Sequence, residues 1–239
     1  MISIKYTLAT IAAFALFSAP TTSCEISPYI GIDGQINRMH FKNGYGSNIF
    51  PKHYPQINLY AGLRYDNSYA LEAGYVSEAV KSKYTTLYTG DVVLGSTVPR
   101  DLSPALFKTY VKVSGYHIGF VNNWCEPQWE SFRVIWGAGF AFLRAEAERD
   151  NISVGNPPIR GNVRHFKKEK VVLRLMLGSE YRFKNNLGIR TSLFFLQTSN
   201  MTMRAQPLVG RYTPVIKPKD SFVYSLGIFY DFWFTVITR

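Results

Sequence analysis

The chain has 239 residues, among them 16 tyrosines and 17 phenylalanines, and a formal net charge of +11. Its two cysteines are too few for a disulfide-stapled scaffold. After residue 24, charges, glycines or prolines interrupt every apolar run, so no later segment is apolar enough for a transmembrane helix. The positive charge favours acidic partners, such as phosphorylated lipid headgroups or polyanionic glycans, and composition does not choose between them.

Residues 1–24 have the layout of a secretory signal peptide. A positive residue, Lys5, precedes an apolar stretch, which is followed by a short run of mostly small residues. The stretch is shorter than the about 20 apolar residues of a membrane helix. We therefore expect cleavage near Cys24, which leaves residues 25–239 as one domain. A lipid anchor on Cys24 is the alternative, but the residues before it lack the leucine that such sites usually carry.

Eight segments alternate, residue by residue, between large apolar side chains and polar or small ones. A period of two is typical of a strand whose faces meet different solvents. Because bulky apolar residues occupy one face of every segment, we predict that this face meets hydrocarbon and that the other lines a barrel lumen. The segments are 29–38, 56–65, 69–77, 110–121, 132–143, 171–183, 187–197 and 221–232.

The links between these segments alternate in length, as they do in an outer-membrane barrel with short periplasmic turns and long external loops. Residues 84–94 have strand propensity too, so they either extend a strand above the membrane or add a hairpin that makes ten strands. The short turns are 66–68, 122–130 and 184–186, and the long links are 40–55, 78–108, 144–170 and 198–220.

The last segment resembles the C-terminal sorting motif of bacterial outer-membrane barrels. Ser225, Gly227, Tyr230 and Phe232 occupy its polar, glycine, hydrophobic and aromatic positions, although the chain continues to Arg239. With the hairpin layout, this motif makes the chain similar to the OmpA-like and opacity-type family of small outer-membrane barrels. The resemblance implies an eight-stranded antiparallel up-and-down barrel, inserted by the outer-membrane assembly machinery. No peptidoglycan-binding domain follows, so the anchoring role of two-domain members is not implied.

Charged residues fall on the predicted inner face and nearly balance. A barrel of eight strands has an interior that side chains can fill, and an unpaired buried ion costs several kcal/mol. We therefore predict an ion-pair network that closes the lumen, and we expect Glu180 and Arg190 to meet across their hairpin. The alternatives are a conduction path or a buried catalytic pair. The residues are Asp33, Arg64, Glu72, Arg133, Arg174, Glu180, Arg182, Arg190 and Asp231.

An enzymatic barrel, such as a lipid A deacylase, is an alternative that the sequence supports weakly. Such an enzyme needs a serine and a histidine in hydrogen-bond reach. The deacylase-like His-x-Ser-x-Gly pattern is absent, because the chain has Gly119 two residues after His117. The other histidines, in predicted loops, lack metal-ligand spacing. We expect no catalytic residue, no metal and no cofactor.

The predicted loops carry the stronger functional signal, because cations gather in the last two of them. In the third loop only Glu169 opposes them. They are expected to contact lipopolysaccharide phosphates, or host polyanions and receptors as an adhesin does. Nucleic acid is not an expected partner. The residues are Arg160, Arg164, Lys167, Lys168, Lys170, Arg204, Arg211, Lys217 and Lys219.

The sequence thus predicts an exported outer-membrane barrel with a structural and surface-interaction role, which is not an open pore. A secreted lipocalin-like carrier of a small apolar ligand is the rival of another class. It is disfavoured because outward Ile, Leu, Phe and Tyr on every strand would meet water. The sequence does not give the ligand or the oligomeric state.

Overall fold

The computed structural model describes residues 26–43, 49–65, 68–93, 96–97, 100, 104–124, 131–152, 164–204 and 215–232. The predicted signal peptide, both cysteines and residues 233–239 lie outside these ranges, so the predictions made for them stay predictions. Among the described residues, no helix is both long and apolar enough to cross a membrane.

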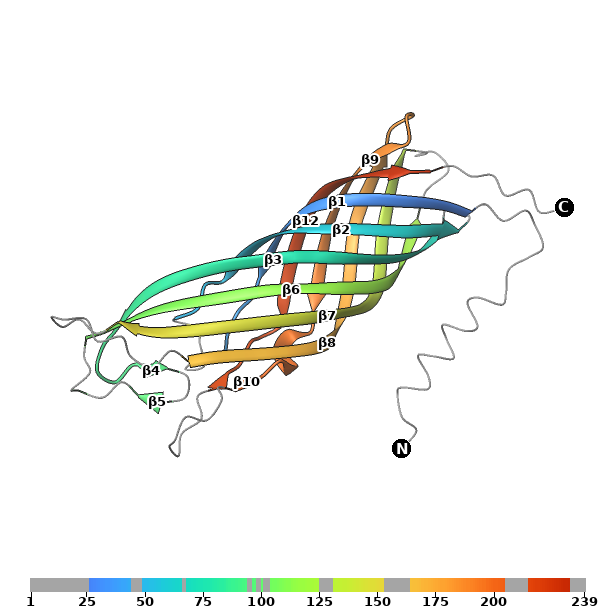
Figure 1. Cartoon of the computed structure of the whole chain (residues 1–239). Coiled ribbons are helices and arrows are strands. Elements are labelled where there is room, and N and C mark those ends of the chain that lie inside the picture. Colours follow the sequence, from blue (N-terminus) through green and yellow to red (C-terminus); the bar gives the residue numbers. More distant parts are fainter. Residues whose placement is uncertain are drawn as a thin grey trace, which may run out of the picture.

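Eight antiparallel strands form a closed barrel in which each strand pairs with its neighbours in chain order, and the last pairs with the first (Figure 1). The predicted fold class and the number of barrel strands are confirmed. The strands are β1 (Ile26–Arg38), β2 (His53–Tyr65), β3 (Tyr69–Leu87), β6 (Ala105–Trp124), β7 (Phe132–Ile152), β8 (Arg164–Arg182), β9 (Leu187–Leu196) and β12 (Ser221–Asp231).

The predicted long links are wrong in their bounds, because much of each is strand. β3 runs to Leu87 and β6 begins at Ala105, so the segment 78–108 extends two barrel strands and adds no barrel hairpin. The smaller elements lie outside the barrel wall. They are the two-residue strands β4 (Val92–Val93), β5 (Ser96–Thr97), β10 (Met203–Arg204) and β11 (Val215–Ile216), and the 3-10 helix η2 (Thr198–Asn200).

The barrel wall is tall on one side and low on the other (Figure 1). β3, β6, β7 and β8 stay paired with one another far beyond the point where their neighbours stop. β2 pairs with β3 only as far as Asn58 and Val76, and β8 with β9 only as far as Arg174 and Leu196. The tall wall is therefore a four-stranded sheet that rises above the closed barrel.

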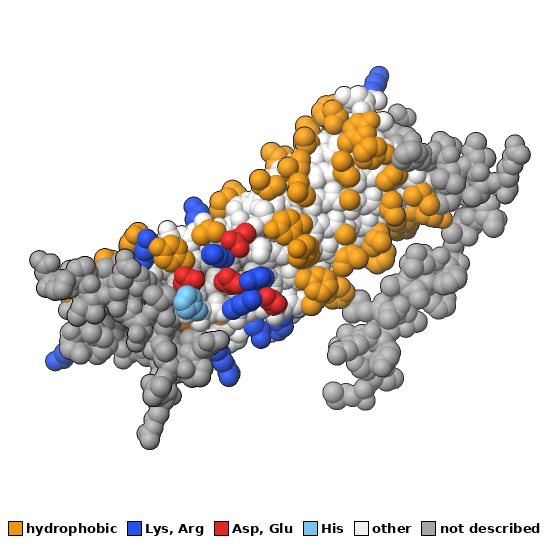
Figure 2. All heavy atoms as spheres, viewed as in Figure 1, with side chains coloured by type: hydrophobic (Ala, Val, Ile, Leu, Met, Phe, Trp, Pro, Cys, Tyr) orange, Lys and Arg blue, Asp and Glu red, His pale blue; other side chains and the backbone are white. Residues whose placement is uncertain are grey.

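The polarity of the two faces inverts along the tall strands. On β7 the outward side chains are apolar from Phe132 to Phe142 and charged at Arg144, Glu146 and Glu148. The apolar stretch matches the about 9–11 residues of a tilted membrane strand. Orange side chains therefore cover one end of the barrel, and charged ones appear beyond them (Figure 2). We call the apolar part the membrane band.

The inner face inverts in the opposite sense. Within the membrane band the buried inward residues are mainly polar, whereas above it they are apolar, as at Val111, Val113 and Phe166. These side chains are covered by residues of the segments that follow β1 and β9, so an apolar core lies above a polar lumen. The covering residues include Met39, Phe41, Ile49, Phe50, Met201, Met203 and Ile216.

Candidate functional site

Seven of the nine predicted lumenal charges form one chain of alternating sign. Glu180 accepts bonds from Arg64 Nη2 (3.0 Å) and from Arg190 Nε and Nη2 (2.9 and 2.6 Å). Arg64 also donates to Asp231 (2.6 Å), and Arg190 to Glu72 (2.5 Å). Arg182 at the Asp231 end (3.1 Å) and Arg174 at the Glu72 end (3.9 Å) complete the chain.

Aromatic rings fill the space around this ion chain. Tyr29 and Tyr60 each lie over a glycine of the neighbouring strand, so that a Cβ on Gly62 or Gly31 would lie within the ring. The guanidinium of Arg64 lies 4.6 Å from the Tyr29 ring centre, and Tyr29 donates to Glu72 (3.1 Å). Rings and ion pairs together close the lower lumen, as expected for a barrel of eight strands.

The other two predicted charges lie near the chain. Arg133 faces Glu180 in the register of β7 and β8. Asp33 takes no direct part and instead accepts a long bond (3.4 Å) from Asn58, whose Oδ1 lies 2.9 Å from Nε2 of His117. His117 is 4% exposed and faces the lumen, away from lipid.

Higher in the lumen, at the boundary between its polar and apolar parts, the described side chains enclose a cavity of about 30 Å³. Its lining includes Gln56, His117 and Arg174. This volume suits about one water molecule. We find no metal-binding group of three or more His, Cys, Asp or Glu residues in the described part of the chain.

The cations predicted to lie in loops are only partly in loops. Arg164, Lys167, Lys168 and Lys170 belong to strand β8, because the strand begins earlier than its apolar stretch suggested. Lys167 faces outward near Glu146 and Glu169, whereas Lys170 donates to the Asn200 carbonyl (2.9 Å). The expectation that Glu169 alone opposes these cations is therefore wrong.

The remaining predicted cations divide in the same way. Arg204 lies on β10 and is exposed. Lys217 and Lys219 lie between β11 and β12. Arg160 and Arg211 fall outside the described residues, as does the side chain of Arg164.

Cations gather at the top of the low wall, where the sequence reading marked only two of them. Backbone bonds hold three segments together there: Lys42 N–H donates to Lys217 O (2.8 Å) and Lys219 N–H to His40 O (2.7 Å). The only carboxylate of these described segments is Asp220, which accepts from Ser199 N–H (2.9 Å). We call this group the basic rim, and it consists of Arg38, His40, Lys42, Lys52, His53, Lys217 and Lys219.

The electrostatics of the basic rim show in one of its own members. Partial burial lowers the pKa of His40, and the neighbouring charges of Arg38, Lys52 and Lys219 lower it further. The outward side chains directly below, at Ile36, Ile57 and Phe222, belong to the membrane band. The rim therefore lies where the apolar surface ends, at the height of lipid headgroups.

The tall wall carries a different charge pattern, visible in Figure 2 as mixed blue and red side chains. Arg144 bonds to Glu146 (2.7 Å), and Glu148 lies 3.2 Å from His165. The bond from Arg144 lowers the pKa of Glu146. Four cations thus alternate with four carboxylates: Lys108, Lys112, Arg144 and Lys167 with Glu78, Glu146, Glu148 and Glu169.

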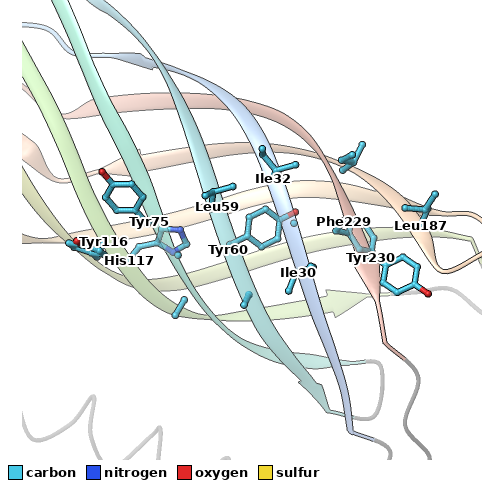
Figure 3. A pocket seen from close by; sticks show the side chains of 15 residues that line it. Ile30, Ile32, Leu59, Tyr60, Tyr75, Tyr116, His117, Leu187, Phe229 and Tyr230 are labelled. Carbon is cyan, nitrogen blue, oxygen red and sulfur yellow. The ribbon is translucent and has the colours of Figure 1, made fainter.

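The membrane band is hollowed on the outer side of β1, β2 and β3 (Figure 3). The hollow measures about 860 Å³. Small outward residues, Ala61 and Ala73, lie side by side in the register of β2 and β3, with Ile30 and Ile118 at either end of the row. The sequence gave no signal for this feature, because it depends on which outward residues become neighbours.

The residues of the predicted assembly signal lie on or beside β12. Ser225 is buried in the lumen, and Gly227 leaves the space that the Asp33 carboxylate occupies. The rings of Tyr230 and Phe232 are 4.9 Å apart, in an edge contact.

No family model matches this chain, and no curated protein matches it. Among solved structures, the outer-membrane protein OprG from Pseudomonas aeruginosa is similar, with a TM-score of 0.53, 13% identity, and 88% of this chain and 98% of OprG covered. Two others have a TM-score of 0.43. They are Ail of Yersinia pestis, in complex with the heparin analogue sucrose octasulfate (13% identity, 88% and 100% covered), and neisserial surface protein A (12%, 86% and 97%).

At these identities the likeness shows the fold. The chain has the fold of the small eight-stranded outer-membrane barrels, and its outward apolar band is that of a protein that spans the outer membrane.

Proposed function

We propose that this protein is a closed outer-membrane barrel whose external cations bind the phosphate groups of lipopolysaccharide. The observation that carries the proposal is the basic rim. Its cations stand on backbone-bonded segments directly above the membrane band, and one carboxylate opposes them in those segments. Anions at this height are the phosphates of the outer leaflet, which a cluster of Lys and Arg attracts.

The lumen supports a structural role. Its ion chain and rings fill the lower interior, and the apolar core lies above them. We further propose that residues 1–24 direct export, that the assembly machinery recognises Ser225, Gly227, Tyr230 and Phe232, and that the chain is a divergent OmpA-like or opacity-type barrel. Catalysis is not part of the proposal, because the buried His117 contacts Asn58 in the lumen.

The test measures binding of lipopolysaccharide to the reconstituted barrel. Replacement of Arg38, Lys52 and Lys219 by Gln is expected to weaken binding and its salt dependence, because three phosphate-pairing charges are removed. The matched control replaces Lys112, Arg144 and Lys167 of the tall wall by Gln, with the same loss of charge. Equal weakening in both triple variants, or binding unaffected by removal of the lipid A phosphates, would contradict the proposal.

A role in surface attachment is the second candidate. The tall wall carries Tyr84 and Tyr88, which are 57% and 63% exposed, beyond the membrane band. Lys108 lies near the Tyr84 and Tyr110 rings, 5.1 and 4.9 Å from their centres. Exposed aromatic groups with a cation are typical of interaction surfaces. Binding of whole cells to immobilised sulfated glycan, compared between the natural chain and a Tyr84→Ser/Tyr88→Ser variant, tests this role.

A further inference from the structure

The hollow in the membrane band adjoins a second hollow of about 840 Å³. Tyr75 and Tyr116 line both, and their rings are 5.1 Å apart, so this pair forms the ridge between them. The first hollow is lined almost entirely by apolar surface (Figure 3). The second is lined in large part by polar groups, including Ser114, Glu78, Arg144 and Glu169.

The second hollow lies where the outward residues change from apolar to charged. Phe142 and Val171 are the last outward apolar residues of β7 and β8, and Arg144 and Glu169 follow them. On β3 the register shifts between Val76 and Ala79. This irregularity lets Glu78 face outward at the same level, where its carboxylate lies 4.0 Å from Lys112.

We propose that the two hollows hold one membrane phospholipid with a zwitterionic headgroup that carries a phosphate and an ammonium. An acyl chain lies in the first hollow, where only hydrocarbon chains or another apolar surface can replace lipid contacts. The phosphate accepts hydrogen bonds from Arg144, which is 53% exposed and reachable from the second hollow. The ammonium pairs with Glu78 and Glu169.

The charges of the second hollow select this headgroup over an anionic one. Arg144 lies 3.8 Å from Glu169, and both side chains are more than half exposed. A phosphate that binds Arg144 competes with this carboxylate and leaves it without its partner. An ammonium on the same headgroup replaces the lost contact, whereas a headgroup with phosphate alone places two anions side by side.

The experiment is native mass spectrometry of the barrel released from vesicles of equal phosphatidylethanolamine and phosphatidylglycerol, two lipids that share the phosphate but not the ammonium. We expect one retained lipid and about fivefold more phosphatidylethanolamine adduct. This ratio corresponds to about 1 kcal/mol, as two exposed ion pairs provide. A Glu78→Gln/Glu169→Gln variant is expected to retain a lipid but lose the preference.

Ala73→Phe is expected to abolish the adduct, because the ring fills the first hollow. Ala138→Phe is the matched control, since Ala138 faces outward on β7 and lies outside both hollows. Heat-modifiable gel migration reports folding, and Ala61→Leu replaces Ala73→Phe if the latter does not fold.

Three outcomes overturn the inference. They are equal adducts of both lipids, a full adduct in the filled variant, and a barrel dimer that Ala73→Phe dissociates, because a dimer would make the hollow a protein interface. The basic-rim variant is expected to keep the adduct, so this test and the lipopolysaccharide test fail independently.

Discussion

Breaking the lumenal ion chain at Glu180 should destabilise the barrel more than breaking it at Arg190. The seven-membered chain has four arginines and three carboxylates, so its formal charge is +1. Glu180→Gln raises that charge to +2 and weakens three bonds to two buried guanidinium groups. Arg190→Gln lowers it to zero, and Glu180 keeps its bond to Arg64.

The magnitudes follow from burial. The side chains of Arg190 and Glu180 are 1% and 0% exposed, so we expect a loss of about 3–5 kcal/mol for Glu180→Gln and a smaller loss for Arg190→Gln. In the double variant the losses should not add. The control is Arg144 with Glu146, which bond at nearly the same distance, 2.7 Å, but are 53% and 28% exposed. Their coupling should be about 0.2–1 kcal/mol.

The measurement is urea unfolding of the barrel in lipid vesicles, followed by tryptophan fluorescence, for both double-mutant cycles. Reversibility is checked by refolding from urea. Additive losses for Glu180 and Arg190 would contradict the pairing. A larger loss for Arg190→Gln than for Glu180→Gln would show that net charge in the lumen does not set the order.

Three further predictions concern the wall and the rim. Leu177→Arg should cost about 2–4 kcal/mol in the same unfolding assay, whereas Glu169→Arg on the same face of β8 should cost far less, and equal costs would misplace the top of the membrane band. Gln56→Ala should cost about 1–3 kcal/mol, because its amide donates to the Ser77 and Val113 carbonyls (3.1 and 2.9 Å) where β2 and β3 part; an unchanged unfolding midpoint would contradict this. Because its pKa is lowered, His40 is neutral near pH 7, and a bound phosphate favours its protonation; lipopolysaccharide affinity should therefore rise as pH falls through that pKa, more in the natural chain than in His40→Gln, and parallel pH profiles would exclude His40 from the rim site.

The sequence predicted the barrel because period-two alternation has a strong signal where lipid lies outside. Leu175 and Leu177 alternate with Arg174 and Met176, and such a contrast marks strand, face and depth together. Seven of the inward charges meet because alternation also fixes which side chains share the lumen. Their partners across the barrel, such as Arg64 and Asp231, depend on closure and register, which one strand does not reveal.

The tall wall escaped prediction because its polarity pattern is inverted. Above the membrane band, Leu143, Ala145 and Ala147 face the apolar core, and Arg144 and Glu146 face water. A search for outward apolar residues reads this stretch as a polar loop. The same inversion explains why Glu146 was missed as a partner of Lys167, since the two meet only in the register of β7 and β8.

The unequal heights of the wall give the two sides of the barrel different relations to the same leaflet. On the low side, strands β1, β2 and β12 end soon after their last apolar residues, and unbalanced cations follow at headgroup height. On the tall side, the strands continue, and the charges at that height belong to a sheet that pairs them internally. Free cations attract polyanionic headgroups, whereas paired charges favour a ligand that carries both signs. Lipopolysaccharide phosphates and a zwitterionic lipid are therefore expected on opposite sides of one barrel, and exchanging the two charge patterns should exchange the two preferences.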